Sequence, residues 1–176
     1  MITRAYREAR EFFGDMPEEV FVLWLYERIR TNGWPPSGNE WQGFLFGHTM
    51  QFWQNLTWSR ERVFISEGRL AEKSAALVEQ VIEANLLGRL NLIARYLPDT
   101  KQRFASIVDY IKVHRDLPKP LVLLDAGGRF EVIDGCHRIS AYTALGKISE
   151  GAALLPETID AWVARPPSNI VDTSNQ

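Results

Sequence analysis

Apolar residues in the first half of the chain recur at the spacing of helix faces. One helical pattern covers residues 3–13, and a second covers about 17–31, where Asn32-Gly33 ends it. A third pattern covers about 40–56, and a long fourth covers 67–92. The first half is therefore predicted to be helical.

After Pro98-Asp99 the pattern changes to alternating helices and short apolar strands. The predicted helices cover 101–114 and 137–146, and the predicted strands cover 121–124, 130–133 and 158–163. Residues 125–129 are predicted to form a hairpin turn between the first two strands. A further short strand or turn is predicted earlier in the chain, at 62–65. The chain is thus predicted to be α+β (α/β), mostly helical, with a small mixed sheet.

The two halves also differ in composition. Five of the six tryptophans lie in the first third of the chain. We expect a helical, aromatic-rich module over 1–95, an α+β domain over 96–165, and a disordered tail over 166–176. The aromatic residues of the first module most often fill a core, and the alternative is a surface that grips a protein partner or stacks bases.

Composition and charge narrow the class of protein. The chain has 176 residues, 45% hydrophobic and 24% charged, with a net charge of -2. That balance gives no general attraction to nucleic acid or to an anionic membrane. The single cysteine and the lack of a long apolar run favour a soluble, cytoplasmic protein with no membrane partner.

Residues 130–142 contain the main group of candidate functional side chains in the sequence. Cys136, His137 and Arg138 stand side by side where an apolar strand runs into a helix, and Gly135 allows a tight turn. The first amides of a helix attract anions, and the histidine and arginine add donors at the same point. The segment indicates a phosphate-binding turn with a thiol built into it.

The motif Gly135-Cys136-His137-Arg138 resembles the active-site motif of the ParB/sulfiredoxin superfamily. The resemblance extends to the preceding helix at 101–111 and the strand at 121–124, and covers about 96–165. It implies a nucleotide-binding fold that uses ATP or CTP with Mg²⁺ for phosphoryl transfer or nucleotide hydrolysis. It also implies that Arg103 and Ser106 supply a basic residue and a hydroxyl to the nucleotide.

Cys136 has two interpretations. A helix N-terminus and the neighbouring Arg138 should lower its pKa, which suits a nucleophile. The resemblance then implies a sulfinic acid reductase, in which this thiol attacks a sulfinyl phosphate. Alternatively, the cysteine is a small residue at a variable position.

The other residues of the turn also have alternatives. Asp134 is expected to coordinate magnesium or to act as a base, or else to cap the following helix. His137 and Arg138 are expected to contact phosphate, although Arg138 has nearby acids such as Asp134 and Glu131 with which to pair. No structural metal site is predicted, because no histidine or cysteine has a second ligand at metal spacing.

These observations leave three hypotheses for the function. The first is a nucleotide-dependent phosphotransferase or hydrolase acting at the turn 134–138. The second is the thiol-based reductase that uses Cys136. The third is a non-catalytic, partition-like or phage-type DNA-associated protein, for which the net charge gives no support.

Overall fold

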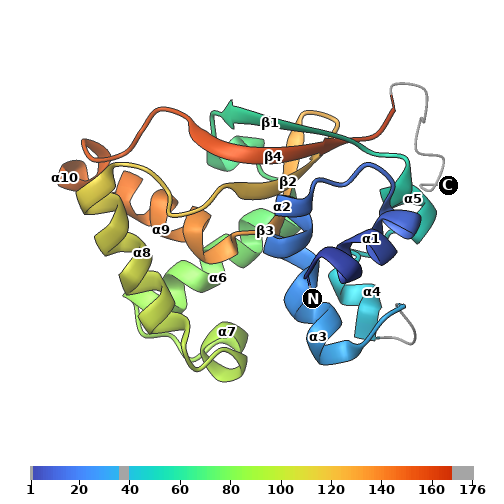
Figure 1. The fold of residues 1–176 in the computed structure, drawn as a ribbon. Helices are drawn as coiled ribbons and strands as arrows, with labels where there is room; N and C mark the ends of the chain where they lie inside the picture. Colours follow the sequence, from blue (N-terminus) through green and yellow to red (C-terminus); the bar gives the residue numbers. More distant parts are fainter. Residues whose placement is uncertain (1, 36–39, 168–176) are drawn as a thin grey trace, which may run out of the picture. The chain divides into compact units, whose positions relative to one another are not determined.

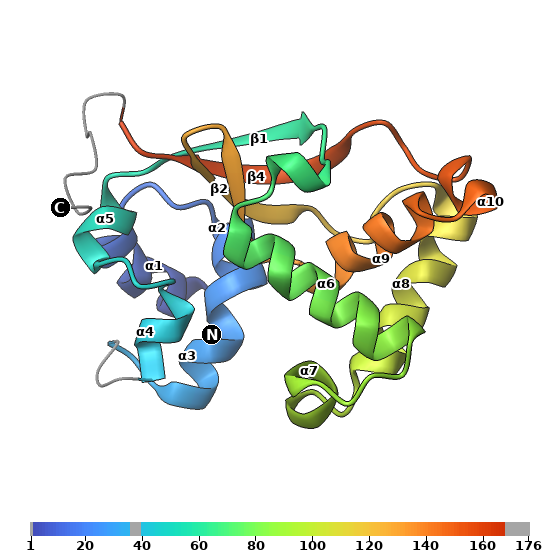
Figure 2. The same cartoon turned by 180° about the vertical axis from the view of Figure 1, so that it is seen from behind.

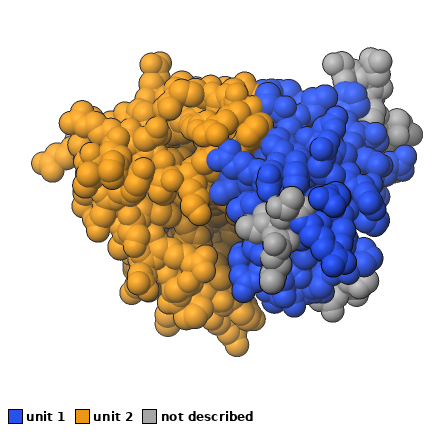
Figure 3. Space-filling view, in the orientation of Figure 1, with its two compact units in different colours: residues 1–59, 163–176 blue, residues 60–162 orange. Residues whose placement is uncertain are grey.

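The computed structural model describes residues 2–35 and 40–167. The chain forms two compact units, one made of residues 1–59 and 163–176 and the other of residues 60–162 (Figure 3). The predicted domain boundary near residue 95 lies inside the second unit and does not coincide with this division. The reason is that the helix over 72–86 packs against the helix that carries the Cys-His-Arg motif.

The described part of the first unit is mainly helical (Figure 1). Its helical elements are α1 (Ile2–Phe13), α2 (Glu18–Val20), the π-helical segment η1 (Phe21–Leu25), α3 (Tyr26–Asn32), α4 (Glu40–Phe44) and α5 (Met50–Gln54). The helix predicted over 17–31 is present with a π-helical segment inside it. The single helix predicted over 40–56 is wrong, because Phe46 (φ 57°) and Gly47 (φ 78°) turn the chain between α4 and α5.

Aromatic side chains build the core of this unit. Phe13, Trp24 and Trp53 are fully buried. The rings of Trp24 and Trp53 lie 4.5 Å apart between centroids, and Phe13 meets Trp24 edge-on at 5.9 Å. The indole N–H of Trp53 donates to the Leu45 carbonyl oxygen at 3.1 Å, which ties α5 to the turn after α4. The expectation that the N-terminal aromatics fill a core is confirmed for these residues.

A four-stranded sheet has the order β1-β4-β2-β3. Its strands are β1 (Thr57–Val63), β2 (Leu121–Ala126), β3 (Arg129–Asp134) and β4 (Ile159–Arg165), and β1 and β4 contain residues of both units. β2 and β3 form the predicted hairpin, whose turn residues Gly127 and Gly128 both have positive φ. The α+β class with a small mixed sheet is therefore confirmed.

The second unit contains six helical elements among the described residues, including the motif helix α9 (Figures 1 and 2). They are η2 (Glu67–Arg69), α6 (Glu72–Leu86), α7 (Leu92–Tyr96), α8 (Thr100–His114), α9 (Cys136–Gly146) and α10 (Ser149–Ala152). α9 packs against both α6 and α8. The helix predicted over 67–92 is shorter than expected at both ends, with Gly88 (φ 63°) in the loop after it. Within the described residues, no helix has the length and apolar character to cross a membrane.

Candidate functional site

The turn that opens α9 depends on Gly135. β3 ends at Asp134, and Gly135 then adopts φ 101°, a conformation that favours glycine. The amide of Ile139 donates to the Gly135 carbonyl oxygen at 3.0 Å, so the N–H groups of residues 136–138 precede the first bond of the helix. A methyl group at Gly135 would lie 2.5 Å from Leu121 Cδ2. The turn is therefore tight, with its first helical amides available for an anion.

Arg138 and Asp134 pair across this turn. Arg138 Nη2 lies 2.5 Å from Asp134 Oδ2, and the two side chains are only 11% and 22% exposed. The buried Nε of Arg138 has no hydrogen-bond partner among the described residues. The pairing of Arg138 with a local acid, one of the two sequence alternatives, is thus present. Asp134 itself directly precedes Gly135, which occupies the N-cap position of α9.

A chain of hydrogen bonds joins α6, α8 and α9 at His137. Asn85 Nδ2 donates to the Val81 carbonyl oxygen at 2.7 Å and to Thr100 Oγ1 at 3.1 Å. Thr100 Oγ1 lies 2.8 Å from His137 Nε2. Thr100 is the first residue of α8 and is 3% exposed, so the middle of this chain is shielded from water.

Charged groups also surround His137. Burial lowers its pKa first, the positive charge of Arg103 lowers it further, and the carboxylates of Asp99 and Asp134 oppose both effects. Arg103 Nε donates to Asp99 Oδ2 at 2.6 Å. Arg103 is thus close enough to His137 to act on its charge. The exposed Ser106 instead donates its hydroxyl hydrogen to the Gln102 carbonyl oxygen at 2.9 Å.

The expected lowering of the Cys136 pKa is wrong. Burial raises the pKa of the Cys136 thiol to about 11, a hydrogen bond with Ser140 opposes this, and the Asp134 carboxylate raises it further. Cys136 is half-buried at the start of α9, the helix that packs against α6 and α8. The positive charge of Arg138 is paired with Asp134 and therefore stabilises a Cys136 thiolate only weakly.

No cluster of three or more His, Cys, Asp or Glu side chains is placed to hold a metal ion in the part of the chain that the structure describes. His48 stacks on Phe52 with 3.9 Å between ring centroids, and His114 lies against Tyr110 at 4.2 Å. Both histidines thus have aromatic neighbours. A magnesium ion at Asp134 would need ligands from elsewhere, such as phosphate oxygens and water.

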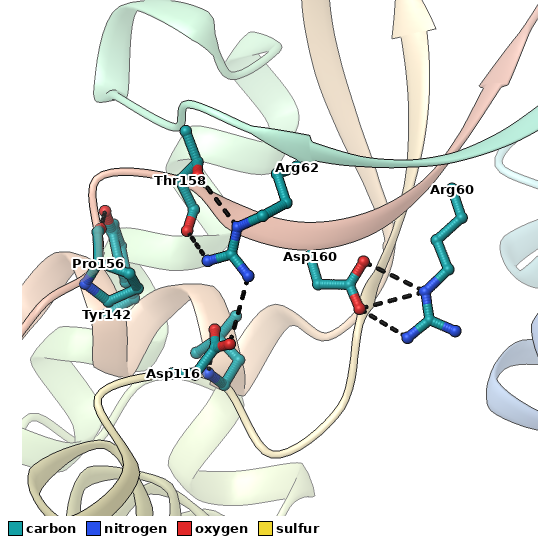
Figure 4. A network of polar contacts seen from close by, with 8 residues as sticks. Arg60, Arg62, Asp116, Tyr142, Pro156, Thr158 and Asp160 are labelled. Atoms are coloured by element: carbon teal, nitrogen blue, oxygen red, sulfur yellow. Dashed lines mark hydrogen bonds and ion pairs between the residues drawn. The ribbon is translucent and has the colours of Figure 1, made fainter.

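The arginines of β1 face acids on neighbouring segments (Figure 4). Arg60 Nη2 lies 2.7 Å from Asp160 Oδ2, and Arg62 contacts Asp116 and Thr158. The guanidinium of Arg69 lies over the ring of Phe130, 4.8 Å from its centroid. Each of these three arginines is thus engaged by an acid or by an aromatic ring.

An apolar groove of about 300 Å³ lies at the C-terminal end of α9. Phe104 and Val108 of α8, Leu145 of α9 and Leu154 line it, with Lys112 among its polar residues. None of residues 134–138 lines this groove. It is therefore separate from the turn that carries the candidate chemistry.

Sequence reasoning missed Asn85, Thr100 and Asp99. Asn85 carried a weak signal, because it is a polar residue beside buried apolar positions of α6, including Val81 and Ile82. Thr100 and Asp99 stand at the start of α8, where such residues are usually read as helix caps. Their contact with the turn depends on how α6, α8 and α9 pack, which the local sequence does not specify.

Comparison of the chain with protein-family models, curated proteins and solved structures finds no significant match. Any proposal for the function must therefore be argued from the geometry of the turn and its surroundings.

Proposed function

We propose that the chain binds ATP or CTP through the phosphate groups at residues 134–138 and uses it for phosphoryl transfer or hydrolysis. The observation that carries this proposal is the convergence of three features at one point. The free first-turn amides of α9, the His137 ring and the Arg103 guanidinium lie around the same turn. Amides, a ring N–H and a guanidinium are all donors that suit phosphate oxygens.

The carboxylates at the turn favour a nucleotide that binds together with Mg²⁺ over a free nucleotide. Arg103 and Arg138 are already paired with Asp99 and Asp134, so the turn is close to electrically neutral. A nucleotide that carries Mg²⁺ meets less repulsion from these acids than a free polyanion does. Magnesium bound to phosphate oxygens typically takes only one or two protein carboxylates, which fits Asp134 with or without Asp99.

Each residue then has a definite task. The amides of residues 136–138 and Arg103 bind phosphate oxygens, and His137 donates one neutral hydrogen bond. Arg138 holds Asp134 at the end of β3, where its carboxylate can meet the cation or accept a proton from the attacking hydroxyl. Magnesium, when it comes with the nucleotide, neutralises charge that develops on the transferred phosphoryl group.

The two alternative functions have less support. A thiol nucleophile needs a thiolate near neutral pH, and burial of Cys136 works against one. A DNA-associated protein needs unpaired cations along a surface, whereas Arg60 and Arg62 face acids.

A binding titration tests the proposal. The full chain is titrated with ATP, CTP, GTP and ADP, with and without Mg²⁺, and so are the variants Arg103→Gln and Lys112→Gln. Loss of one charged hydrogen bond should weaken binding by about tenfold or more in Arg103→Gln. Lys112 is exposed on the same helix near its other end and should leave the affinity unchanged. Absence of saturable binding by the wild-type chain would refute the proposal.

A further inference from the structure

We propose that Asn85 and Thr100 are positioning residues that hold His137 as a neutral imidazole with its proton on Nδ1, so that Nδ1–H is the donor offered to a bound phosphate. The assignment of the proton follows from the hydrogen bonds alone. Its use in phosphate binding rests on the proposed function.

The orientation of Asn85 is the first step. The side-chain amide atom placed 2.7 Å from the Val81 carbonyl oxygen must be the nitrogen, because that carbonyl can only accept. The same nitrogen lies 3.1 Å from Thr100 Oγ1 and donates its second hydrogen there. This orientation leaves the buried Oδ1 of Asn85 without a hydrogen-bond partner among the described residues, but a flipped amide would place two oxygens 2.7 Å apart at Val81. Asn85 is therefore fixed as a donor to Thr100.

The direction of the next bond follows. Thr100 Oγ1 accepts from Asn85 and keeps one hydrogen of its own to donate. Among the described residues, the structure gives that hydrogen no acceptor other than His137 Nε2, at 2.8 Å. A hydroxyl that donates to Nε2 requires a lone pair on that nitrogen. The proton of neutral His137 must then be on Nδ1.

The charges around the ring favour the same neutral form. Arg103 faces His137 from α8 and disfavours an imidazolium, while Asp99, just before α8, and Asp134, at the end of β3, favour one. Burial disfavours the charged ring as well, and the hydroxyl of Thr100 is almost fully shielded from water. His137 is thus held beside the turn as an uncharged ring whose Nε2 is fixed against Thr100.

Nuclear magnetic resonance of the full chain labelled with ¹⁵N at histidine tests this assignment directly. Two-bond correlations between ring protons and ring nitrogens distinguish the tautomers, and His137→Gln identifies the signals of His137. At about pH 7.5, above the usual histidine range, we expect Nδ1 to carry the proton in the wild-type chain. Finding the proton on Nε2 would overturn the proposal without any variant.

Substitutions at Thr100 test the cause. Thr100→Val keeps the shape of the side chain but removes the hydroxyl, so the preference for Nδ1–H should disappear, whereas Thr100→Ser should keep it. Thr143→Val, a matched change on α9, should leave the tautomer as in the wild type. An unchanged tautomer in Thr100→Val would also overturn the proposal. If that variant does not fold, the wild-type and Thr100→Ser spectra still decide.

The binding readout separates this inference from the proposed function. One neutral hydrogen bond is worth roughly threefold to tenfold in affinity, so Thr100→Val should weaken ATP or CTP binding by about that factor and Thr100→Ser should not. If the tautomer is found as expected but the wild-type chain binds no nucleotide, the proposed function fails and the assignment of the proton stands. If nucleotide binds and Thr100→Val binds it equally well, the positioning role fails.

Discussion

Arg138 and Asp134 form a short ion pair of 2.5 Å across the turn that joins β3 to α9. Both side chains are largely withdrawn from water, at 11% and 22% exposure, so each charge depends on the other for its stabilisation. The pair fastens the last residue of β3 to the first turn of α9. Arg138 therefore has a structural role at this site, whether or not it also contacts a ligand.

The dependence of the two charges on each other predicts the effect of breaking the pair. Asp134→Asn leaves the buried guanidinium without its counter-charge and should lower the free energy of unfolding by about 1–3 kcal/mol. Urea unfolding followed by circular dichroism measures this. The matched control is Asp99→Asn, which breaks the exposed pair with Arg103 and should change stability by less than about 1 kcal/mol. Equal losses in the two variants would contradict the structural role.

A second prediction concerns the space behind Gly135. Gly135→Ala places a methyl group 2.5 Å from Leu121 Cδ2 and 2.8 Å from Arg138 Nη2, at a φ of 101°. Backbone strain and overpacking together should lower the free energy of unfolding by about 2–4 kcal/mol. Urea unfolding again gives the measurement.

Gly128→Ala is the control for that experiment. Gly128 also has a positive φ, of 89°, but a methyl group there meets nothing within 4 Å. It should show only the backbone strain, about 1–2 kcal/mol. The difference between the two variants isolates the packing contribution at Gly135. Equal losses of stability would mean that the side chains of Leu121 and Arg138 shift to accommodate the methyl group at little cost.

The elements that the sequence predicted well are those with strong local signals. The β2–β3 hairpin has two apolar runs around Gly127-Gly128, and α9 follows directly on Gly135. β1 was underestimated because its polar sequence and its largely exposed side chains lack the alternation of a half-buried strand. Its place in the sheet beside β4 comes from pairing with a segment distant in sequence.

The candidate site was predicted in part for the same reason. The sequence predicted the turn at Gly135, because a glycine between an apolar strand and a helix is a local signal, whereas Arg103 was named only from the family resemblance. The sequence could not predict Asn85 and Thr100, which reach His137 only through the packing of α6, α8 and α9. The sign of the Cys136 pKa shift was wrong because burial raises the pKa of the thiol.

Cys136 should react slowly with alkylating reagents. With its pKa raised from 9.0 to about 11, the thiolate fraction near neutral pH is about 100-fold below that of an ordinary thiol. Iodoacetamide labelling of the folded chain should be slow at neutral pH and should accelerate up to about pH 11. The same chain unfolded in urea is the control and should label at the ordinary rate. Rapid labelling of the folded chain at neutral pH would restore the thiol nucleophile as a candidate.

The lowered pKa of His137 predicts a loss of stability in acid. The folded chain holds the ring neutral, while the unfolded chain protonates it near the usual value of 6.5, so protons bind the unfolded state preferentially below that pH. The stabilisation by the neutral ring is fully present above pH 6.5 and is lost as the pH falls through 6.5 toward the folded pKa. Unfolding free energies at about pH 7.5 and 5.5 measure this, since carboxylates of ordinary pKa stay mostly ionised in that range.

His137→Gln should show a smaller decrease between these two pH values than the wild type, because it has no ring to protonate beside Thr100 and Arg103. His114→Gln, on α8 and exposed, is the control and should keep the wild-type decrease. If His137→Gln retained the full decrease, protonation of another group would have to explain the acid sensitivity. The hydrogen bond from Thr100 would then contribute little to holding the ring neutral.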